Sequence, residues 1–528
     1  MKVDEVVKDG RPLVSRDQFQ LPARKTVHWL MGLLLVYVVI RSVVAAAMKP
    51  FWYDEVTTIT LSSQPSLKGI WVALARAVDG QPPSFFWIER AAISFLRNIQ
   101  IAARLPAILA MPCTMICVFV YAKKRSGEAI AFLCAFLLLS TVLFSRYAAE
   151  ARPYSMLMAC IAFAMLCYQR LPSLFWTVML GISLVLAQTL HYYAIFAMVP
   201  FVLAETVVFL RTRQFRWSVW LALVCGPIPL LVFGPLLAKL RSYYGAHYYT
   251  HYGFTSLPST YGAFFLADSG YGAAVAVVSI AGVLGTLLLV RPGTSVKPEI
   301  RNAHAVEATL LTVMVALPLI ACVVINVMHG GMRDAYAMGA VIGICLAVGC
   351  ALSLTKPAVV VLFAIFLFSS VGVREFIFWR SNHSLHLVPA TVAIEEFIDK
   401  SGYSDLPVVV ASGMRYTPLA YYASPEFFRR LYYLADEEKQ FKYQGADTLD
   451  KHVVILRDYL PLQVRGFSEF TSAHLKFIVY AEEPDDGGTW LPIYLSHEAA
   501  CVQLIGMDAN RRLYLVTMKK VSAPGSGR

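Results

Sequence analysis

The sequence predicts a mostly α-helical fold: a polytopic bundle of about 11 transmembrane spans, followed by a small C-terminal α/β domain. The first indication is composition, because 58% of the 528 residues are hydrophobic and only 15% are charged. The second is a series of apolar runs that approach the roughly 17–25 residues a helix needs to cross a bilayer. The third is a shift near residue 375, after which the chain becomes charged and carries short strand-like runs.

The first span sets the orientation of the bundle. Cytoplasmic segments of membrane proteins are rich in Lys and Arg, and residues 1–28 carry Lys2, Lys8, Arg11, Arg16, Arg24 and Lys25. The apolar run from Trp29 to Met48 is of full span length and lacks the short core of a cleavable signal peptide. We therefore expect a cytoplasmic tail, then an uncleaved span that emerges on the outer side near Met48.

The segment between Met48 and the basic run 123–125 holds two apolar stretches. If both crossed the membrane, the basic run would lie outside, against the Lys/Arg rule. The first stretch, 83–96, has 14 residues and carries Glu89 and Arg90, so we predict an interfacial or re-entrant helix on the outer side. The second, 101–121, is predicted to be span two.

The remaining apolar runs alternate consistently with the positions of Lys and Arg. They predict spans at 129–144, 154–168, 174–190, 194–210, 217–237, 271–290, 306–327, 336–354 and 357–373. An odd total places the C-terminal part outside. The predicted domains are therefore a cytoplasmic tail (1–28), a transmembrane domain (29–375) and an extracytoplasmic α/β domain (376–528).

Alternating apolar residues and turn signals predict short strands in the C-terminal domain. The predicted strands are 406–411, 452–456, 476–480, 501–506 and 511–518, the last two joined by a hairpin turn at 507–510. Residues 389–400 and 417–423 are predicted to be helical.

The net charge of +12 fits cytoplasmic loops, and no basic groove with interleaved aromatic residues indicates a nucleic-acid partner. The ten cysteines lack CxxC pairs and zinc-site spacing, so we expect neither a disulfide framework nor a zinc site.

Unusual polar residues gather at the predicted outer ends of the spans. Asp54 and Glu55 follow span one directly, and a carboxylate this close to hydrocarbon is costly unless it has a partner or a task. Further polar groups stand at 79–83, 150–154, 191–193 and 329–336. A transporter would instead place ionisable residues near the membrane midplane. Among the residues inside the predicted spans we single out Arg41. The pattern predicts a site where the bundle meets water on its outer face.

Five short motifs carry a resemblance to a known superfamily: Tyr53-Asp54-Glu55, Asp79-Gly80-Gln81-Pro82-Pro83-Ser84-Phe85-Phe86, Arg104-Leu105-Pro106, Glu150-Ala151-Arg152-Pro153-Tyr154 and His191-Tyr192-Tyr193. Together they resemble the GT-C polytopic glycosyltransferases, nearest to the protein O-mannosyltransferase-like and lipid A aminoarabinose transferase-like bacterial enzymes (glycosyltransferase family 39/83-like). The likeness covers roughly residues 25–375 and implies a GT-C type bundle.

The resemblance also implies a reaction. The donor would be a sugar on a polyprenyl phosphate, and the acceptor a hydroxyl of a lipid, glycan or protein at the outer face of the bacterial inner membrane. Asp54 matches the family's catalytic carboxylate. Many relatives have His or Lys just before the double proline, where this chain has Gln81, so the resemblance leaves the role of that position open.

The residue types suit this chemistry, because a carboxylate can take the acceptor's proton and arginines can hold the leaving phosphate. We assign Asp54 and Glu55 as catalytic candidates. The substrate-binding candidates are Asp79, Gln81, Glu150, Arg152, Tyr154, Tyr192, Arg333, Tyr336 and Arg41. A divalent metal cation is an expected option, with Asp79, Glu150 and His191 as its ligands.

Two alternatives remain open from the sequence. One is a transporter or flippase of a lipid-linked saccharide, which needs polar residues along a path to the cytoplasmic face. The other is a ligase or polymerase of lipid-linked polysaccharide. The sequence names neither the sugar nor the acceptor.

Overall fold

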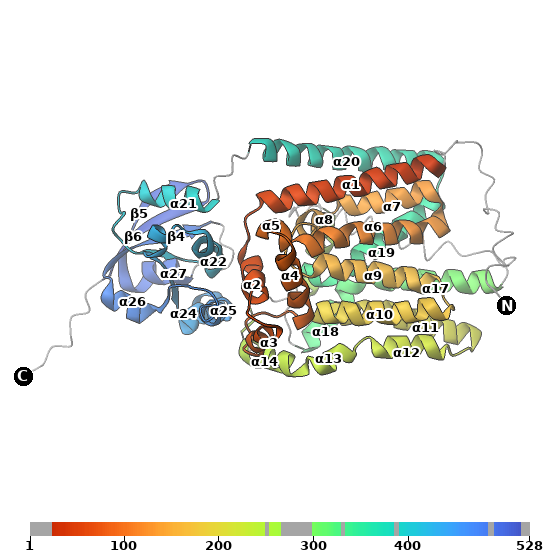
Figure 1. The fold of residues 1–528 in the computed structure, drawn as a ribbon, viewed down its shortest axis with the longest axis horizontal. Coiled ribbons are helices and arrows are strands. Elements are labelled where there is room, and N and C mark those ends of the chain that lie inside the picture. The colour runs from red at the N-terminus through yellow and green to blue at the C-terminus, as the bar shows by residue number, and fades with distance from the viewer. Residues whose placement is uncertain are drawn as a thin grey trace, which may run out of the picture.

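The computed structural model describes residues 24–245, 247–248, 253–265, 298–328, 333–384, 390–483 and 490–518. The chain forms a long helical bundle with a smaller sheet domain at one end (Figure 1). We call residues 390–518 the sheet domain. The prediction of a mostly helical protein with a small C-terminal α/β domain is confirmed.

The long helices of the bundle run roughly side by side in Figure 1. They are α1 (Arg24–Met48), α6 (Leu105–Ser126), α7 (Glu128–Ser140), α9 (Tyr154–Gln169), α10 (Leu174–Leu190), α11 (Val199–Thr212), α17 (Pro298–Val315), α19 (Gly339–Ser353) and α20 (Pro357–Ser384). At the centre α6, α7, α9 and α19 pack on one another through apolar side chains. Helices that are apolar on most sides suit a bundle buried in lipid.

Shorter elements connect these helices. They are α8 (Val142–Tyr147), η2 (Tyr192–Met198), α12 (Trp217–Cys225), α13 (Ile228–Val232), α14 (Gly234–Tyr244), η3 (Phe254–Ser256), α15 (Leu257–Phe265), α18 (Leu317–Met328) and η4 (Asp334–Ala337).

Helix length and hydropathy identify four helices able to cross a membrane in the described parts of the chain, or six if two bent pairs each count as one span. The bends are 56° between Trp217–Val232 and Gly234–Tyr244, and 57° between Arg301–Val315 and Leu317–Val327. The chain is therefore a membrane protein. Four further apolar helices of 10–17 residues coincide with predicted spans, and the predicted span 271–290 lies outside the described residues. The predicted total of about 11 is not confirmed.

Four helices lie across the end of the bundle next to the sheet domain: α2 (Tyr53–Ser62), α3 (Leu67–Ala75), α4 (Pro83–Phe95) and α5 (Ile99–Ala102) (Figure 1). Pro83 stands in the first turn of α4, where its missing N–H costs nothing. The run 83–96 therefore forms the predicted short helix. Its position at the membrane interface stays a prediction.

The sheet domain holds six strands in the order β3-β2-β1-β4-β6-β5. They are β1 (Val408–Val410), β2 (Leu431–Ala435), β3 (Val464–Gly466), β4 (Lys476–Glu482), β5 (Ala500–Asp508) and β6 (Arg511–Met518). The first four pair in parallel, and β6 runs antiparallel to both β4 and β5. The predicted hairpin of the last two strands is confirmed.

Helices cover the sheet: α21 (Ala390–Asp399), α22 (Gly413–Tyr422), α23 (Pro425–Phe428), α24 (Glu437–Gln444), α25 (Thr448–Leu456), α26 (Phe467–Ala473), α27 (Trp490–Tyr494) and the π-helical turn η5 (Leu495–Ala499). The predicted strand 452–456 is wrong, because these residues form the end of α25. Leu449, Val453 and Leu456 recur at helical spacing and are buried, and this period outweighs the β-branched pair Val453-Val454.

The sheet domain is docked on the short helices at the end of the bundle. Tyr53 of α2 belongs to the same apolar core as Val408 and Tyr416 of the sheet domain. Leu456 of α25 packs in the other direction, into the core formed around α3 and α4. The backbone N–H of Phe51 also donates to the hydroxyl of Tyr422 at 2.9 Å. Side chains of the two domains therefore pack together in common apolar cores, close to the polar residues at this end of the bundle.

Candidate active site

The segment after α1 turns directly into α2, whose first residues are Tyr53, Asp54 and Glu55. Acidic residues suit the first turn of a helix, because its free N–H groups and dipole favour negative charge. Glu55 accepts a hydrogen bond from the backbone N–H of Trp52 at 3.3 Å. This contact closes the start of α2.

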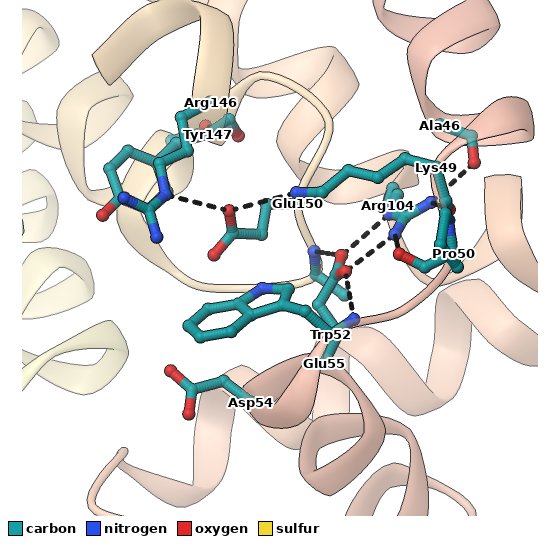
Figure 2. Close-up of polar contacts among 12 residues, drawn as sticks. Ala46, Lys49, Pro50, Trp52, Asp54, Glu55, Arg104, Arg146, Tyr147 and Glu150 are labelled. Carbon is teal, nitrogen blue, oxygen red and sulfur yellow. Dashed lines mark hydrogen bonds and ion pairs between the residues drawn. The ribbon is translucent and has the colours of Figure 1, made fainter. Parts of the chain in front are cut away.

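Glu55 and Arg104 form a fully buried ion pair (Figure 2). The guanidinium donates from Nε to Oε1 and from Nη2 to Oε2, each at 2.7 Å. The backbone N–H of Ala151 adds a bond of 2.8 Å to Oε1. Arg104 also donates to the carbonyl oxygens of Ala46, Lys49 and Pro50. The pair thus fastens α1, α2, α6 and the loop at 150–152 together.

Asp54 has a different environment from its neighbour. Its carboxylate is directed away from the Glu55–Arg104 pair (Figure 2), and its side chain is 20% exposed. The atom Oδ2 lies 3.9 Å from Nη2 of Arg152 and 3.9 Å from Nη1 of Arg333. These separations are ion pairs rather than hydrogen bonds. Both guanidinium groups therefore face the Asp54 carboxylate without saturating it.

Arg152 joins two of the predicted site carboxylates. Its Nη1 donates to Oδ2 of Asp79 at 2.9 Å and to the hydroxyl of Thr58 at 3.2 Å. The other Asp79 oxygen accepts from the backbone N–H of Gln81 at 2.9 Å. We call Asp54, Asp79, Arg152 and Arg333 the Asp54 cluster.

Glu150 is completely buried beside this cluster. Its Oε2 lies 3.6 Å from Nζ of Lys49 and 3.9 Å from Nε of Arg146 (Figure 2). Burial raises the pKa of Glu150 to about 7, and the charge of Lys49 only partly opposes this rise. Glu150 therefore changes its protonation state near neutral pH.

His191 is buried among aromatic rings. Its ring centroid is 5.7 Å from that of Tyr154 and 4.9 Å from that of Tyr336. Nδ1 accepts the backbone N–H of Tyr193 at 3.1 Å, so the proton of the neutral ring is on Nε2. Burial, and after it the charge of Arg152, lower the pKa of His191 to about 3. His191 is thus a neutral N–H donor.

Several buried polar atoms around the Asp54 cluster have no hydrogen-bond partner among the described residues. They are Gln81 Oε1, Arg152 Nε, His191 Nε2, Tyr192 OH and both carboxylate oxygens of Glu89 and of Glu150. An orphaned buried polar group typically costs about 1–3 kcal/mol. Such a concentration at one place is typical of a site that is completed by a ligand or by water.

Glu89 is a residue that sequence reasoning missed as part of the site. It lies on the buried face of α4 with Phe85 and Phe86 and is completely buried. Burial raises its pKa well above the ordinary value, and the charge of Glu55 adds to the rise. The signal was available, because an acid at i+3 and i+4 from two apolar residues faces the core.

His452 of the sheet domain was also missed. Its Nδ1 is hydrogen-bonded to the hydroxyl of Tyr53, the residue before Asp54. Sequence reasoning could not find this contact, because it assigned residues 452–456 to a strand of a separate domain.

Arg41 does not join the Asp54 cluster in the described structure. Its Nε pairs with Oε2 of Glu375 at 2.5 Å, and its guanidinium covers the ring of Phe378 at 4.2 Å. Arg41 thus links α1 with α20. Its predicted role in substrate binding stays a prediction.

The expected metal ligands Asp79, Glu150 and His191 do not gather around one point. No group of three or more His, Cys, Asp or Glu side chains suited to a metal ion occurs among the described residues. Asp79 is engaged by Arg152, and the free ring nitrogen of His191 carries a proton. In this arrangement the donors do not fit a divalent cation, and metal dependence stays a prediction.

The comparison with protein families gives one match. The family model for dolichyl-phosphate-mannose-protein mannosyltransferase matches residues 80–238. This segment contains Gln81, Glu150, Arg152 and His191, whereas Asp54 and Asp79 precede it. No curated protein sequence matches the chain significantly.

Three solved structures are distantly similar to the chain. The apo form of ArnT from Cupriavidus metallidurans is 14% identical with a TM-score of 0.43, covering 93% of this chain and 98% of that chain. The same protein bound to undecaprenyl phosphate is 14% identical with a TM-score of 0.40, and the match covers 95% of this chain and 100% of that chain. The Archaeoglobus fulgidus oligosaccharyltransferase tethered to an acceptor peptide is 10% identical with a TM-score of 0.41. The match covers 86% of this chain and 69% of that chain.

The family match is the finding that bears on the predicted resemblance, since the structural likenesses are distant. It covers the motifs at Gln81, Glu150 and His191 on which the resemblance was partly based. The resemblance of this chain to the GT-C glycosyltransferases is confirmed over residues 80–238.

Proposed function

We propose that the protein is a membrane glycosyltransferase that moves a sugar from a polyprenyl-phosphate donor to a hydroxyl of a lipid, glycan or protein acceptor. Transfer takes place at the outer face of the bacterial inner membrane, with the sheet domain on that side. The observation that carries the proposal is the Asp54 carboxylate, 3.9 Å from both Arg152 and Arg333. The matching family is itself named for a sugar on a polyprenyl phosphate, which supports this donor class.

Asp54 acts as the general base in this proposal. Its side chain is 20% exposed, so an acceptor hydroxyl can approach it. The acceptor oxygen forms a bond to the anomeric carbon, the bond from that carbon to the phosphate oxygen breaks, and Asp54 takes the hydroxyl proton. A positioned base of this kind typically contributes about 10²–10⁴-fold to the rate.

Arg152 and Arg333 receive the charge of the departing polyprenyl phosphate. A guanidinium fork matches phosphate oxygens and is always charged. Arg152 is held in place by Asp79 at 2.9 Å, whereas the Arg333 side chain is 34% exposed. We therefore assign Arg152 as the fixed part of the phosphate site and Arg333 as the part that meets the donor from the solvent side.

The unpartnered atoms beside Arg152 supply sugar contacts. Gln81 Oε1 is an acceptor, His191 Nε2–H is a donor, and the Tyr192 hydroxyl is both. A sugar carries hydroxyl groups that both donate and accept, so it complements this set. Tyr154 and Tyr336 flank His191 and form the walls of this part of the site.

Glu55 has a positioning role in the proposal rather than a catalytic one. Both of its oxygens are already occupied by Arg104 and by backbone N–H groups. The Glu55 side chain is also completely buried, so an acceptor hydroxyl cannot reach it. It fixes the first turn of α2, from which Asp54 projects.

The test is turnover by the purified protein. A panel of radiolabelled polyprenyl-phosphate sugars is supplied with envelope extract, and the products are identified by mass spectrometry beside glycans from cells with and without the protein. We expect label to move from one lipid donor to a glycan, lipid or protein. Movement of intact donor across vesicles without cleavage of the sugar–phosphate bond would identify a flippase and overturn the proposal.

A further inference from the structure

The sheet domain contributes a side chain to the interior of the candidate site. His452, on α25, contacts the helix that bears Asp54, although the two residues are far apart in the sequence. We infer that His452 is a positioning residue that ties together the two segments carrying Asp54 and Asp79, and that the sheet domain is therefore part of the catalytic unit. The catalytic importance of Asp54 and Asp79 rests on the proposed function. The contact between His452 and Tyr53 does not depend on it.

The ring of His452 lies between two backbone segments of the bundle. Nδ1 is bonded to the hydroxyl of Tyr53, and the two ring centroids are 5.0 Å apart. The ring also lies beside the backbone of Val78, which acts to raise the pKa of the imidazole. Tyr53 immediately precedes Asp54, and Val78 immediately precedes Asp79. One imidazole thus spans the backbone segments that present both acids to Arg152.

The neutral ring suits the bond to Tyr53. With the ring proton on Nε2, Nδ1 accepts the proton of the Tyr53 hydroxyl. Burial lowers the pKa of His452, with Asp79 and Asp54 acting against burial and Arg152 acting with it. The neutral form therefore dominates at pH 7.

A second contact of α25 fixes the angle of this helix on the bundle. Leu456 lies four residues after His452 and is completely buried in a core with Leu61 and Leu74. Residues at i and i+4 lie on the same face of a helix. The face that carries His452 is consequently held against α2 and α3 by apolar packing, so the hydrogen bonds do not hold the domain alone.

The separation of the two acids matters because both pair with Arg152. Asp79 contacts this arginine at 2.9 Å and Asp54 at 3.9 Å. A displacement of about 1 Å in a reacting group can cost about 100-fold in rate. Loss of the His452 bridge removes one restraint on each acid-bearing segment while leaving all groups that touch the substrate in the chain.

The experiment compares His452→Ala and His452→Gln, with His474→Ala as the matched control because His474 packs on Tyr432 and Phe470 within the sheet domain. We expect His452→Ala to lower kcat by about 10–100-fold with little change in the donor KM. His452→Gln should recover much of the lost kcat, because an amide oxygen can also accept the bond from the Tyr53 hydroxyl. The kcat of the double variant Tyr53→Phe/His452→Ala should be no lower than that of the more severe single variant, because both changes remove the same contact.

A second readout does not depend on turnover. Hydrogen exchange followed by mass spectrometry should quicken at backbone amides 53–58 and 78–81 in His452→Ala but not in His474→Ala. Normal kcat with unchanged exchange in His452→Ala would overturn the inference. Faster exchange in a protein whose wild type transfers no sugar would uphold the bridge and reject the proposed function. If His452→Ala does not fold, Tyr53→Phe and His452→Gln decide by the same two measurements.

Discussion

Two arginine–carboxylate clusters that begin at neighbouring residues of α2 are built in opposite ways. Glu55 and Arg104 are both completely buried and meet through two bonds of 2.7 Å. Asp54 stands partly exposed and lies 3.9 Å from two guanidinium groups. The hydrogen bonds of the Glu55–Arg104 pair are already made, and we call this pair the saturated cluster. The Asp54 cluster has capacity for a ligand, and we call it the open cluster in this comparison.

The saturated cluster positions the open one. A carboxylate and a guanidinium buried in apolar surroundings are stable only when nearly all their bonds are satisfied. The backbone bonds to Glu55 and Arg104 meet this condition and fix the end of α1 and the start of α2. Asp54 projects from the turn that is fixed in this way. The comparison predicts that substitutions in the open cluster lower activity and that substitutions in the saturated cluster lower stability.

The largest expected effect is that of Asp54→Asn on turnover. The change keeps size and shape but removes the proton acceptor, so transfer should fall by about 10²–10⁴-fold. Melting temperature and donor binding should be nearly unchanged, because the arginines rather than Asp54 hold the phosphate. The measurement is turnover of a labelled polyprenyl-phosphate sugar by the purified variant, beside a thermal melt.

Two other outcomes for Asp54→Asn would be decisive in the opposite direction. Near-normal turnover in a well-folded variant would reject Asp54 as the base and transfer that role to Asp79 or Glu150. Unfolding of the variant with wild-type activity per folded molecule would show that the open cluster is structural, which would remove the contrast with Glu55.

Arg104→Met should have the largest effect on stability. The substitution leaves Glu55 as an uncompensated buried charge, and breaking a buried pair in this way typically costs about 3–5 kcal/mol. We expect a correspondingly lower midpoint of denaturant unfolding in detergent, with Arg104→Lys intermediate because it keeps the charge but loses the fork. A wild-type midpoint for Arg104→Met would mean that the Glu55–Arg104 pair does not hold the bundle end.

Much of this contrast lay beyond the sequence. The sequence predicted that Asp54, Asp79 and Arg152 would meet, because all three stand at span ends on one side of the bundle, and the structure joins them. It could not distinguish Asp54 from Glu55, since adjacent residues on a helix diverge by about 100° and only the tertiary contact with Arg104 decides which is buried. Arg104 was visible as part of a motif, but its carbonyl partners were not.

The fold shows the same division between local and distant information. Apolar length predicted most of the bundle helices, because a membrane helix satisfies its own backbone. The predicted strand at 452–456 failed because two β-branched residues were read without the longer helical period around them. This error concealed His452, whose role depends on a contact with Tyr53 about 400 residues away.

Glu150→Gln should change the pH dependence of stability. Burial raises the pKa of Glu150 from its ordinary 4.5 to about 7, so the folded protein binds more protons than the unfolded chain between these values. The stability that this group contributes is complete below about pH 4.5 and is lost as pH rises through about 7, a fall of about 3 kcal/mol in unfolding free energy. The variant should lack this fall.

The measurement for Glu150→Gln is denaturant unfolding in detergent at pH 5, 6, 7 and 8. Glu438→Gln is the matched control, because Glu438 is an exposed acid on α24 of the sheet domain. The wild type and Glu438→Gln should lose stability together as pH rises. Parallel curves for all three proteins would mean that Glu150 is not protonated near neutral pH in the folded protein.

The smallest expected effect is that of Arg333→Gln, which tests whether the exposed side of the open cluster meets the donor. A charge-assisted bond to phosphate that is partly screened by solvent supports a rise of about 10-fold in the donor KM, with a smaller change in kcat. The donor KM of Arg333→Lys should lie between those of the wild type and Arg333→Gln, because lysine keeps the charge without the guanidinium fork. Arg465→Gln is the control, since Arg465 forms an exposed pair with Glu469 in the sheet domain. Equal donor KM values in all four proteins would leave Arg152 as the phosphate ligand and confine the open cluster to Asp54, Asp79 and Arg152.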